Sequence, residues 1–273
     1  MTDRARALGL FAFVLALILP GPARAQGRAG DAVPSAVVAG TVELVEGYVR
    51  FFDRSLRARA PGLGEPILEG EAVVTGADGE VHLRMQDGGL IAVRPGTYLR
   101  IAGFRAEGEE SDRLAIRLLE GSFRSVTGWI GKFARGNYRV QTPNAVIGVR
   151  GTDHEPFYIP ETSTLGEPGT YDKVNAGSTY VETEVGRVGV DPGRAAFAAL
   201  RPAEPPRLLD RIPAHFRPTK NEARIARGYE GMQEQLDRMR EDRRNEMRGQ
   251  GRTPDSMRDG QRRGGGGARR GGH

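Results

Sequence analysis

The chain has 273 residues, four of them histidine and none cysteine. The lack of cysteine excludes a disulfide scaffold, thiolate zinc and iron–sulfur sites and a cysteine nucleophile, and four histidines argue against a histidine-rich metal site. Lys and Arg total 40 against 35 for Asp and Glu, but residues 201–273 hold 18 basic and 11 acidic side chains. The positive charge therefore belongs to the C-terminal quarter, and residues 1–200 are slightly acidic.

The N-terminus has the three parts of a secretory signal peptide. Arg4 and Arg6 precede an apolar run from Leu8 to Leu19, and Ala23-Arg24-Ala25 supplies the small residues of a cleavage site. The run of about 12 residues is shorter than the roughly 20 needed to span a bilayer. We predict a signal peptide over 1–25 cleaved after Ala25, a linker over 26–36, a periplasmic location and no membrane span; an uncleaved short anchor is the alternative.

Residues 37–200 show the period-two alternation of β-strands. Asp-Gly and Pro-Gly pairs separate the apolar runs, and Gly79, Asp87 and Gly88 are interpreted as turn residues. The predicted strands are 41–45, 48–51, 71–75, 81–85, 90–93, 98–101, 114–118, 121–126, 178–185 and 187–190. This spacing predicts an all-β fold, as a sandwich, a roll or a short β-solenoid.

Four segments carry a resemblance to a known family. They are 70–79 (GEAVVTGADG), 83–89 (LRMQDGG), 114–121 (LAIRLLEG) and 142–152 (TPNAVIGVRGT), and the last is the most specific. Their order resembles the FecR-type extracytoplasmic domain over residues 40–155, with a looser fit to about 200. The resemblance implies a β-rich periplasmic domain of the kind found in iron-uptake signalling regulators. Those regulators also carry an anti-sigma segment and a membrane span; neither is recognised here, which favours a free-standing exported module.

The candidate contact site is Gly148, Arg150, Gly151 and Thr152. The two glycines permit a positive φ or the close approach of another strand, so that Arg150 projects from a constrained backbone. Its planar guanidinium suits a carboxylate or several carbonyl groups. Two interpretations stay open: a contact with a ligand or partner, and an internal arginine whose hydrogen bonds close the β fold.

The run Asp153-His154-Glu155 is interpreted as a surface polar cluster and not as a metal site. Neighbouring side chains of a strand point to opposite faces, so only Asp153 and Glu155 share one. Glu109, Glu110 and Asp112 lie in a polar loop that we expect to be solvated. No catalytic or nucleotide-binding motif occurs, and we predict no catalytic residue, no metal and no cofactor.

Residues 156–177 are rich in Pro, Gly, Glu and Thr and are predicted to form a long loop. Long loops on β scaffolds often carry binding sites. The alternative is an insertion that only covers a sheet edge.

The C-terminal part divides into three segments. Five prolines make 201–218 an extended linker. An amphipathic helix is predicted over 219–248, with Thr219 and Glu222 as a capping box and an apolar stripe of Ile225, Tyr229, Met232, Leu236 and Met239. The stripe is expected either to dock on the β domain or to bind another chain.

The Arg/Gly-rich residues 249–273 are predicted to be disordered. They lack aromatic side chains for base stacking, so we expect contact with anionic surfaces and no binding of nucleic acid. Altogether the sequence predicts an exported, non-enzymatic periplasmic binding or scaffold protein whose partner is an unknown protein or envelope polymer. A component of a cell-surface signalling relay is the alternative, followed by a periplasmic hydrolase without a recognisable motif.

Overall fold

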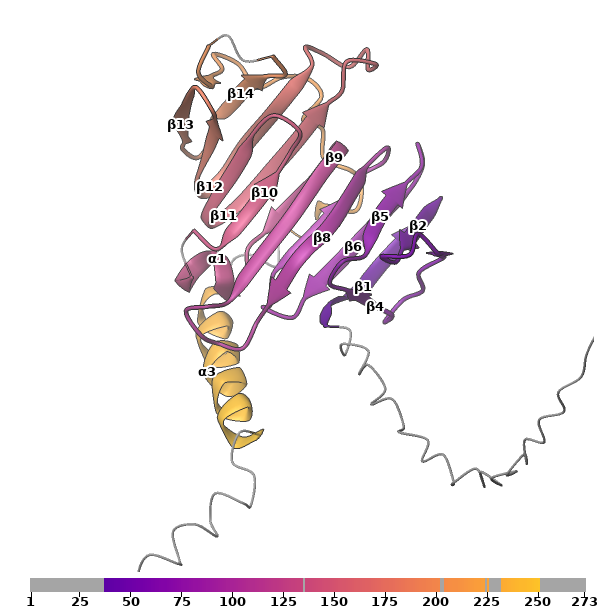
Figure 1. The fold of residues 1–273 in the computed structure, drawn as a ribbon, viewed down its shortest axis with the longest axis vertical. Coiled ribbons are helices and arrows are strands. Elements are labelled where there is room, and N and C mark those ends of the chain that lie inside the picture. The colour runs from indigo at the N-terminus through magenta and orange to yellow at the C-terminus, as the bar shows by residue number, and fades with distance from the viewer. Residues whose placement is uncertain (1–36, 135, 202–203, 224, 226–231, 251–273) are drawn as a thin grey trace, which may run out of the picture. The chain divides into compact units, whose positions relative to one another are not determined.

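The computed structural model describes residues 37–134, 136–201, 204–223, 225 and 232–250. The predicted signal peptide, the linker 26–36 and the tail from residue 251 lie outside these residues. The described part of the chain is dominated by strands, which confirms the all-β fold (Figure 1).

The described residues form fifteen strands of one sheet and two helices. The first eight strands are β1 (Val38–Glu46), β2 (Val49–Phe52), β3 (Ala58–Arg59), β4 (Pro66–Leu68), β5 (Ala72–Thr75), β6 (Glu80–Met85), β7 (Leu90–Val93) and β8 (Tyr98–Arg105). They are followed by β9 (Arg113–Val126), α1 (Trp129–Phe133), β10 (Tyr138–Gln141), β11 (Val146–Ile159), β12 (Gly169–Thr183), β13 (Gly186–Val190), β14 (Ala195–Ala199), β15 (Arg207–Leu208) and α3 (Met232–Gln250).

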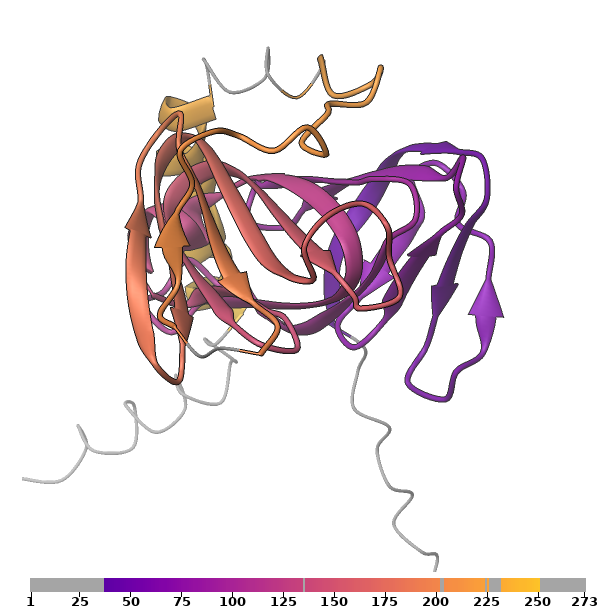
Figure 2. The same cartoon turned by 90° about the horizontal axis from the view of Figure 1, so that it is seen from above.

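The sheet is open and mixed, and it folds back on itself into two layers because three long strands belong to both (Figure 2). The first half of β9 pairs with β8 and β10, and its second half pairs with β7 and β11. The first part of β11 pairs with β10 and its second part with the second half of β9. The first part of β12 pairs with β14 and its last part with β13, and β11 and β12 pair with each other in both layers. Layer I is β3-β2-β5-β8-β9-β10-β11-β12-β13, and layer II is β4-β1-β6-β7-β9-β11-β12-β14-β15.

The apolar core lies between the layers. Leu99, Ile116 and Ile147 of layer I and Leu83 and Ile91 of layer II belong to one cluster and are at most 1% exposed. Burial of this apolar area is the main stabilising contribution.

A glycine marks each bend between the layers. Gly121, Gly151 and Gly177 have φ of 78°, 60° and 76°, a region that other residues rarely adopt. The sequence predicted two strands here, 114–118 and 121–126, whereas β9 continues through Gly121.

The outer face of layer II is covered by the chain's own C-terminal residues. Ile225 and Leu236 pack against Leu90, Ala92 and Val126. Phe216 packs against Phe157. Of the two interpretations of the apolar stripe, docking on the β domain is the one that the structure shows for Ile225 and Leu236. Tyr229 lies outside the described residues.

Two predicted segments differ from the structure. The predicted loop 156–177 is reduced to residues 160–168, because β11 extends to Ile159 and β12 begins at Gly169. The aromatic residues Phe157 and Tyr171 pair across these strands and are buried, which offsets the turn-forming composition around them. In the predicted linker 201–218, β15 pairs with β14 and Phe216 is buried.

Candidate functional site

The predicted contact residues lie at the bend of β11. Gly148 lies under the ring of Tyr180, since a Cβ there would be 2.0 Å from the ring Cζ. Thr152 is fully buried, and its backbone N–H bonds the hydroxyl of Thr127. The constrained backbone expected around Arg150 is thus present, with Gly151 supplying the positive φ.

Arg150 is exposed, and the interpretation as an internal arginine is wrong. Its guanidinium carbon lies 5.9 Å from the centroid of the Tyr180 ring, and that of Arg187 lies 4.2 Å from it. Among the described residues, Arg150 has no hydrogen-bonding or ion-pair partner. A contact with a ligand or partner remains a prediction for Gly148, Arg150, Gly151 and Thr152.

The run Asp153-His154-Glu155 is buried, so the prediction of a surface cluster is wrong. The expected alternation holds: Asn175 bonds both Asp153 and Glu155, while His154 bonds Asp172 at 2.9 Å on the other side of the strand. Asp153 and Glu155 are buried because the C-terminal segment with Glu222 covers their face, and His154 is buried beside the rings of Phe123 and Tyr138. In the described part of the chain, no three potential ligands converge as a metal site.

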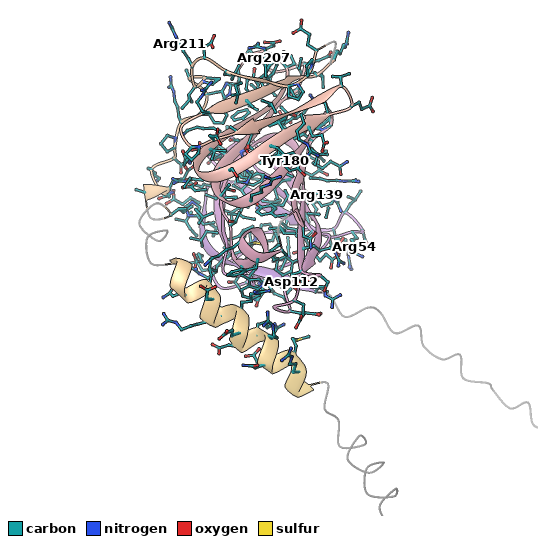
Figure 3. The ribbon with its side chains drawn as sticks, turned by 90° about the vertical axis from the view of Figure 1, so that its left-hand side faces the viewer. Arg54, Asp112, Arg139, Tyr180, Arg207 and Arg211 are labelled. Carbon is teal, nitrogen blue, oxygen red and sulfur yellow. The ribbon has the colours of Figure 1, made fainter. Side chains whose placement is uncertain are left out.

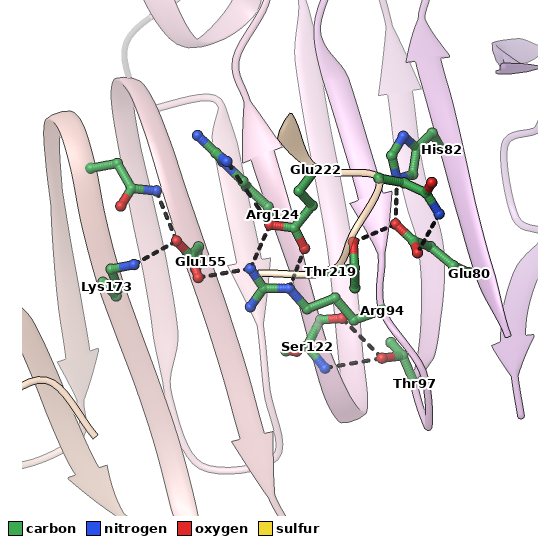
Figure 4. Close-up of polar contacts among 12 residues, drawn as sticks. Glu80, His82, Arg94, Thr97, Ser122, Arg124, Glu155, Lys173, Thr219 and Glu222 are labelled. Atoms are coloured by element: carbon green, nitrogen blue, oxygen red, sulfur yellow. Dashed lines mark hydrogen bonds and ion pairs between the residues drawn. The ribbon is translucent and has the colours of Figure 1, made fainter. Parts of the chain in front are cut away.

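A buried network of charges joins the C-terminal segment to layer II (Figure 4). Arg94 follows β7 and is 4% exposed. Its Nε and Nη2 donate to the two carboxylate oxygens of Glu222 at 2.6 and 2.8 Å, and Nη2 also donates to Glu155 at 2.8 Å. Lys173 bonds the other oxygen of Glu155 at 2.8 Å. Charge pairing of this quality is what burial of ionised groups requires.

A second pair in this network lies beside Arg94. Arg124 holds Asp153 with two hydrogen bonds, of 2.9 and 2.6 Å, and its Nη1 lies 3.9 Å from Glu222. Glu222 is therefore placed between two arginines. The geometry fixes the segment before α3 on the sheet.

The predicted capping box is wrong. Residues 220–222 are in a turn and not in the first turn of a helix; the hydroxyl of Thr219 donates to Glu80 at 2.6 Å, and Glu222 is bound by Arg94. Asn221 also bonds Glu80, which in turn bonds His82. Both members of the box instead attach the segment to layer II.

The charges of the network shift the pKa values of Glu155 and Arg94 so that the charged form of each is favoured. Burial of Glu155 opposes its ionisation, but the charge of Arg94 and the hydrogen bonds from Lys173 and Asn175 outweigh it and hold the pKa at about 2. Burial likewise opposes the charge of Arg94, and the bonds to Glu222 and Glu155 raise its pKa nevertheless. Glu155 therefore contributes stability above its unfolded pKa of 4.5, and this contribution is lost as the pH falls toward 2.

The polar loop before β9 is organised by a buried carboxylate, contrary to the expectation of a solvated loop. Asp112 is 0% exposed and accepts hydrogen bonds from the backbone of Glu107, Gly108 and Glu109. The indole of Trp129 donates to the same carboxylate at 2.9 Å. Asp112 therefore has a structural role in connecting β8, β9 and α1.

Asp87 is also more than a turn residue. Its carboxylate is buried and accepts the backbone N–H of Gly89, while Gly88 has the positive φ expected of the turn. Burial, together with the charge of Asp112, raises the pKa of Asp87 from 3.8 to about 6.

The raised pKa predicts a pH dependence of stability. A carboxyl with a higher pKa in the folded state stabilises it at low pH, and that contribution is lost as the pH rises from 3.8 through 6. Between pH 4 and 7 we expect the unfolding free energy of the wild type to fall by up to about 3 kcal/mol relative to an Asp87→Asn variant. Urea unfolding at a series of pH values measures this; a difference between the two proteins that is constant with pH would contradict it.

The fold and the network define an all-β domain in which the C-terminal segment of the same chain covers the outer face of layer II. Residues 71–164 match the family model described as FecR protein. These residues run from β5 through β11 and include Arg94, Arg150 and Glu155. This match confirms, over residues 71–164, the resemblance seen in the sequence.

Other comparisons add structural similarity only. No curated protein matches the chain. Two crystal structures of a candidate anti-sigma factor from Parabacteroides distasonis ATCC 8503 are similar at 14% and 15% identity, with TM-scores of 0.41 and 0.39. The first match covers 52% of this chain and 60% of that protein, and the second covers 51% and 59%. A cell surface anchoring domain is similar at 28% identity with a TM-score of 0.22, over 22% of this chain and 80% of that domain.

None of the helices in the described ranges has the length and apolar character needed to cross a bilayer.

Proposed function

We propose that this chain is an exported, non-enzymatic binding protein of the periplasm, in which the FecR domain presents the outer face of layer I to a partner. The observation that carries this proposal is that the chain covers one outer face of the sheet and leaves the other exposed. The face of layer II is closed by Glu222 and Ile225, whereas the face of layer I exposes Arg150 and Arg139.

Two observations support a role without catalysis. The match to the FecR model supports a role without catalysis. In addition, the buried acidic side chains Asp153, Glu155 and Glu222 are each bonded to a basic side chain, so their hydrogen-bonding capacity serves the fold. General acid–base catalysis needs such groups within reach of a substrate.

The binding role is tested by site-specific crosslinking in intact cells. A photoreactive amino acid at position 139 or 150 is expected to give adducts, because both positions lie on the open face. The matched control is position 63, whose leucine is 70% exposed in the segment between β3 and β4. Adducts from position 63 alone, or from none of the three, would contradict the proposal.

Export predicts the N-terminus of the mature protein. Protein from the periplasmic fraction is expected to begin at Gln26, because Ala23 and Ala25 satisfy the preference of signal peptidase for small residues. An Ala25→Arg variant is expected to accumulate with its N-terminus uncleaved. Wild-type protein that is confined to the cytoplasm and begins at Met1 would rule out export.

A further inference from the structure

The outer face of layer I gathers arginines from neighbouring strands. Arg100 of β8 lies opposite Arg117 of β9, which in turn lies opposite Gln141 of β10. Arg139 lies opposite Ala115 on one side and Gly148 on the other. Directly opposite residues share a face, and the alternate residues Ile116 and Val140 are in the core, so these side chains point outward.

Five guanidinium groups of this face have no carboxylate partner among the described residues. They are Arg100, Arg113, Arg117, Arg139 and Arg150. Three of them bond only uncharged oxygens: Arg100 that of Gly70, Arg117 the amide of Gln141, and Arg139 that of Gly136.

The paired groups lie at the margins of the patch. Arg105 bonds Glu107 at one margin, and Arg187 bonds Glu182 at the other. Glu120 is exposed beside the bend of β9. Residues 1–200 carry more acidic than basic side chains, so a face with five unpaired arginines marks a segregation of charge.

Small residues lie between these arginines. Gly103 lies opposite Ala115, and the guanidinium Nε of Arg113 lies 4.0 Å from the point that a Cβ of Gly103 would occupy. Further along the same row, Tyr180 lies across Gly148; Figure 3 shows Arg139 and Tyr180 on this side of the molecule. Arginines on adjacent strands are separated by roughly 5 Å directly and 7–8 Å diagonally, so positive charges recur at short intervals across the face.

The chemistry of this face selects among anionic ligands. Gln141 and Ser178 add amide and hydroxyl groups to the guanidiniums, and large apolar side chains are few: Leu119, near the bend of β9, is 38% exposed. A protein partner would need an apolar centre in the interface. Guanidinium groups bind carboxylates or phosphates with two hydrogen bonds, and the uncharged polar groups suit sugar hydroxyls.

We infer that the outer face of layer I binds a linear acidic polysaccharide that runs across strands β8 to β12. The inference rests on the proposed binding role and names its ligand. The sheet supplies a rigid array of cations, so little side-chain order is lost in meeting a polymer with regularly spaced anions.

The test uses polygalacturonate as the probe and the mature chain as the protein. An Arg117→Gln/Arg139→Gln/Arg150→Gln variant is expected to bind at least tenfold more weakly and with a smaller dependence on salt. The matched control carries the same loss of charge on or directly after strands of layer II, as Arg84→Gln/Arg207→Gln/Arg211→Gln, and is expected to stay within twofold of the wild type. Neutral dextran is expected not to bind, and equal urea midpoints establish that the variants are folded.

Three outcomes would overturn the inference. The first is binding that survives in the triple variant but is lost when Arg262, Arg263, Arg269 and Arg270 of the tail become glutamine. The second is stronger binding to phosphatidylglycerol vesicles, and the third is stronger binding to polyglutamate, in either case with the same dependence on the face. If positions 139 and 150 give crosslinks in cells while polygalacturonate does not bind, the inferred ligand is wrong and the proposed function stands. If there are neither crosslinks nor binding of polygalacturonate, both the inferred ligand and the proposed function are wrong.

Discussion

Replacing Arg94 with methionine is expected to lower the free energy of unfolding by about 3–5 kcal/mol, because the substitution leaves buried carboxylates without their cation. Glu222 is 1% exposed and would lose two hydrogen bonds, and Glu155 would keep only Lys173 and Asn175. Urea unfolding measures the loss. Hydrogen exchange should also show faster exchange of the Glu222 and Ile225 amides, because their side chains would no longer be held on layer II.

Two further variants separate the buried pair from general effects of removing an arginine. Arg84 on β6 pairs with Glu43, and both side chains are exposed, so Arg84→Met is expected to cost less than about 1 kcal/mol. An Arg94→Met/Glu222→Met double variant is expected to recover most of the lost stability, because replacing both charges with apolar groups removes the desolvation cost. If Arg94→Met costs no more than Arg84→Met, the network does not hold the segment.

The strands could be predicted because their signals are local. Period-two alternation and the Gly186 turn were sufficient for the β12–β13 hairpin, and the four segments between 70 and 152 were sufficient for the resemblance to the FecR-type domain. Two strands, 114–118 and 121–126, were predicted where β9 is continuous, because a glycine has the same local signature in a turn between two strands and in a bend within one. Only the pairing of β9 with four other strands distinguishes them.

The buried network could not be predicted from local patterns. Arg94 is 61 residues from Glu155 and 128 from Glu222, and no pattern within one element indicates that they meet. Taken singly, each of these charged residues has the pattern of an ordinary surface residue. For the same reason the sequence predicts Asp153-His154-Glu155 to lie on the surface. The arginines of layer I did have a signal, since Arg113 and Arg117 share one face of a strand. That signal is also typical of any solvated strand face, and only the pairing of β8 to β12 shows that the arginines form one patch.

Gly177→Ala is expected to destabilise the fold by about 3 kcal/mol or more, through two separate effects. Its φ of 76° costs a residue with a Cβ about 1–2 kcal/mol. Its Cβ would also lie 2.1 Å from the carbonyl oxygen of Gly151, which is backbone and cannot turn aside. Because Gly151 and Gly177 face each other at the bends of β11 and β12, relief of the clash would require both strands to move.

Two other glycines separate these effects. Gly193 has the same φ of 76° with open space around its Cβ position, so Gly193→Ala is expected to cost only the strain of the backbone, about 1–2 kcal/mol. Gly189 lies in β13 with open space and no positive φ, so Gly189→Ala is expected to change stability by less than about 0.5 kcal/mol. Urea unfolding of the three variants should rank them Gly177, Gly193, Gly189 in order of cost. If Gly177→Ala costs no more than Gly193→Ala, the close approach of β11 and β12 at the bend is not a constraint on the fold, and the path of both strands from layer I to layer II must have another cause.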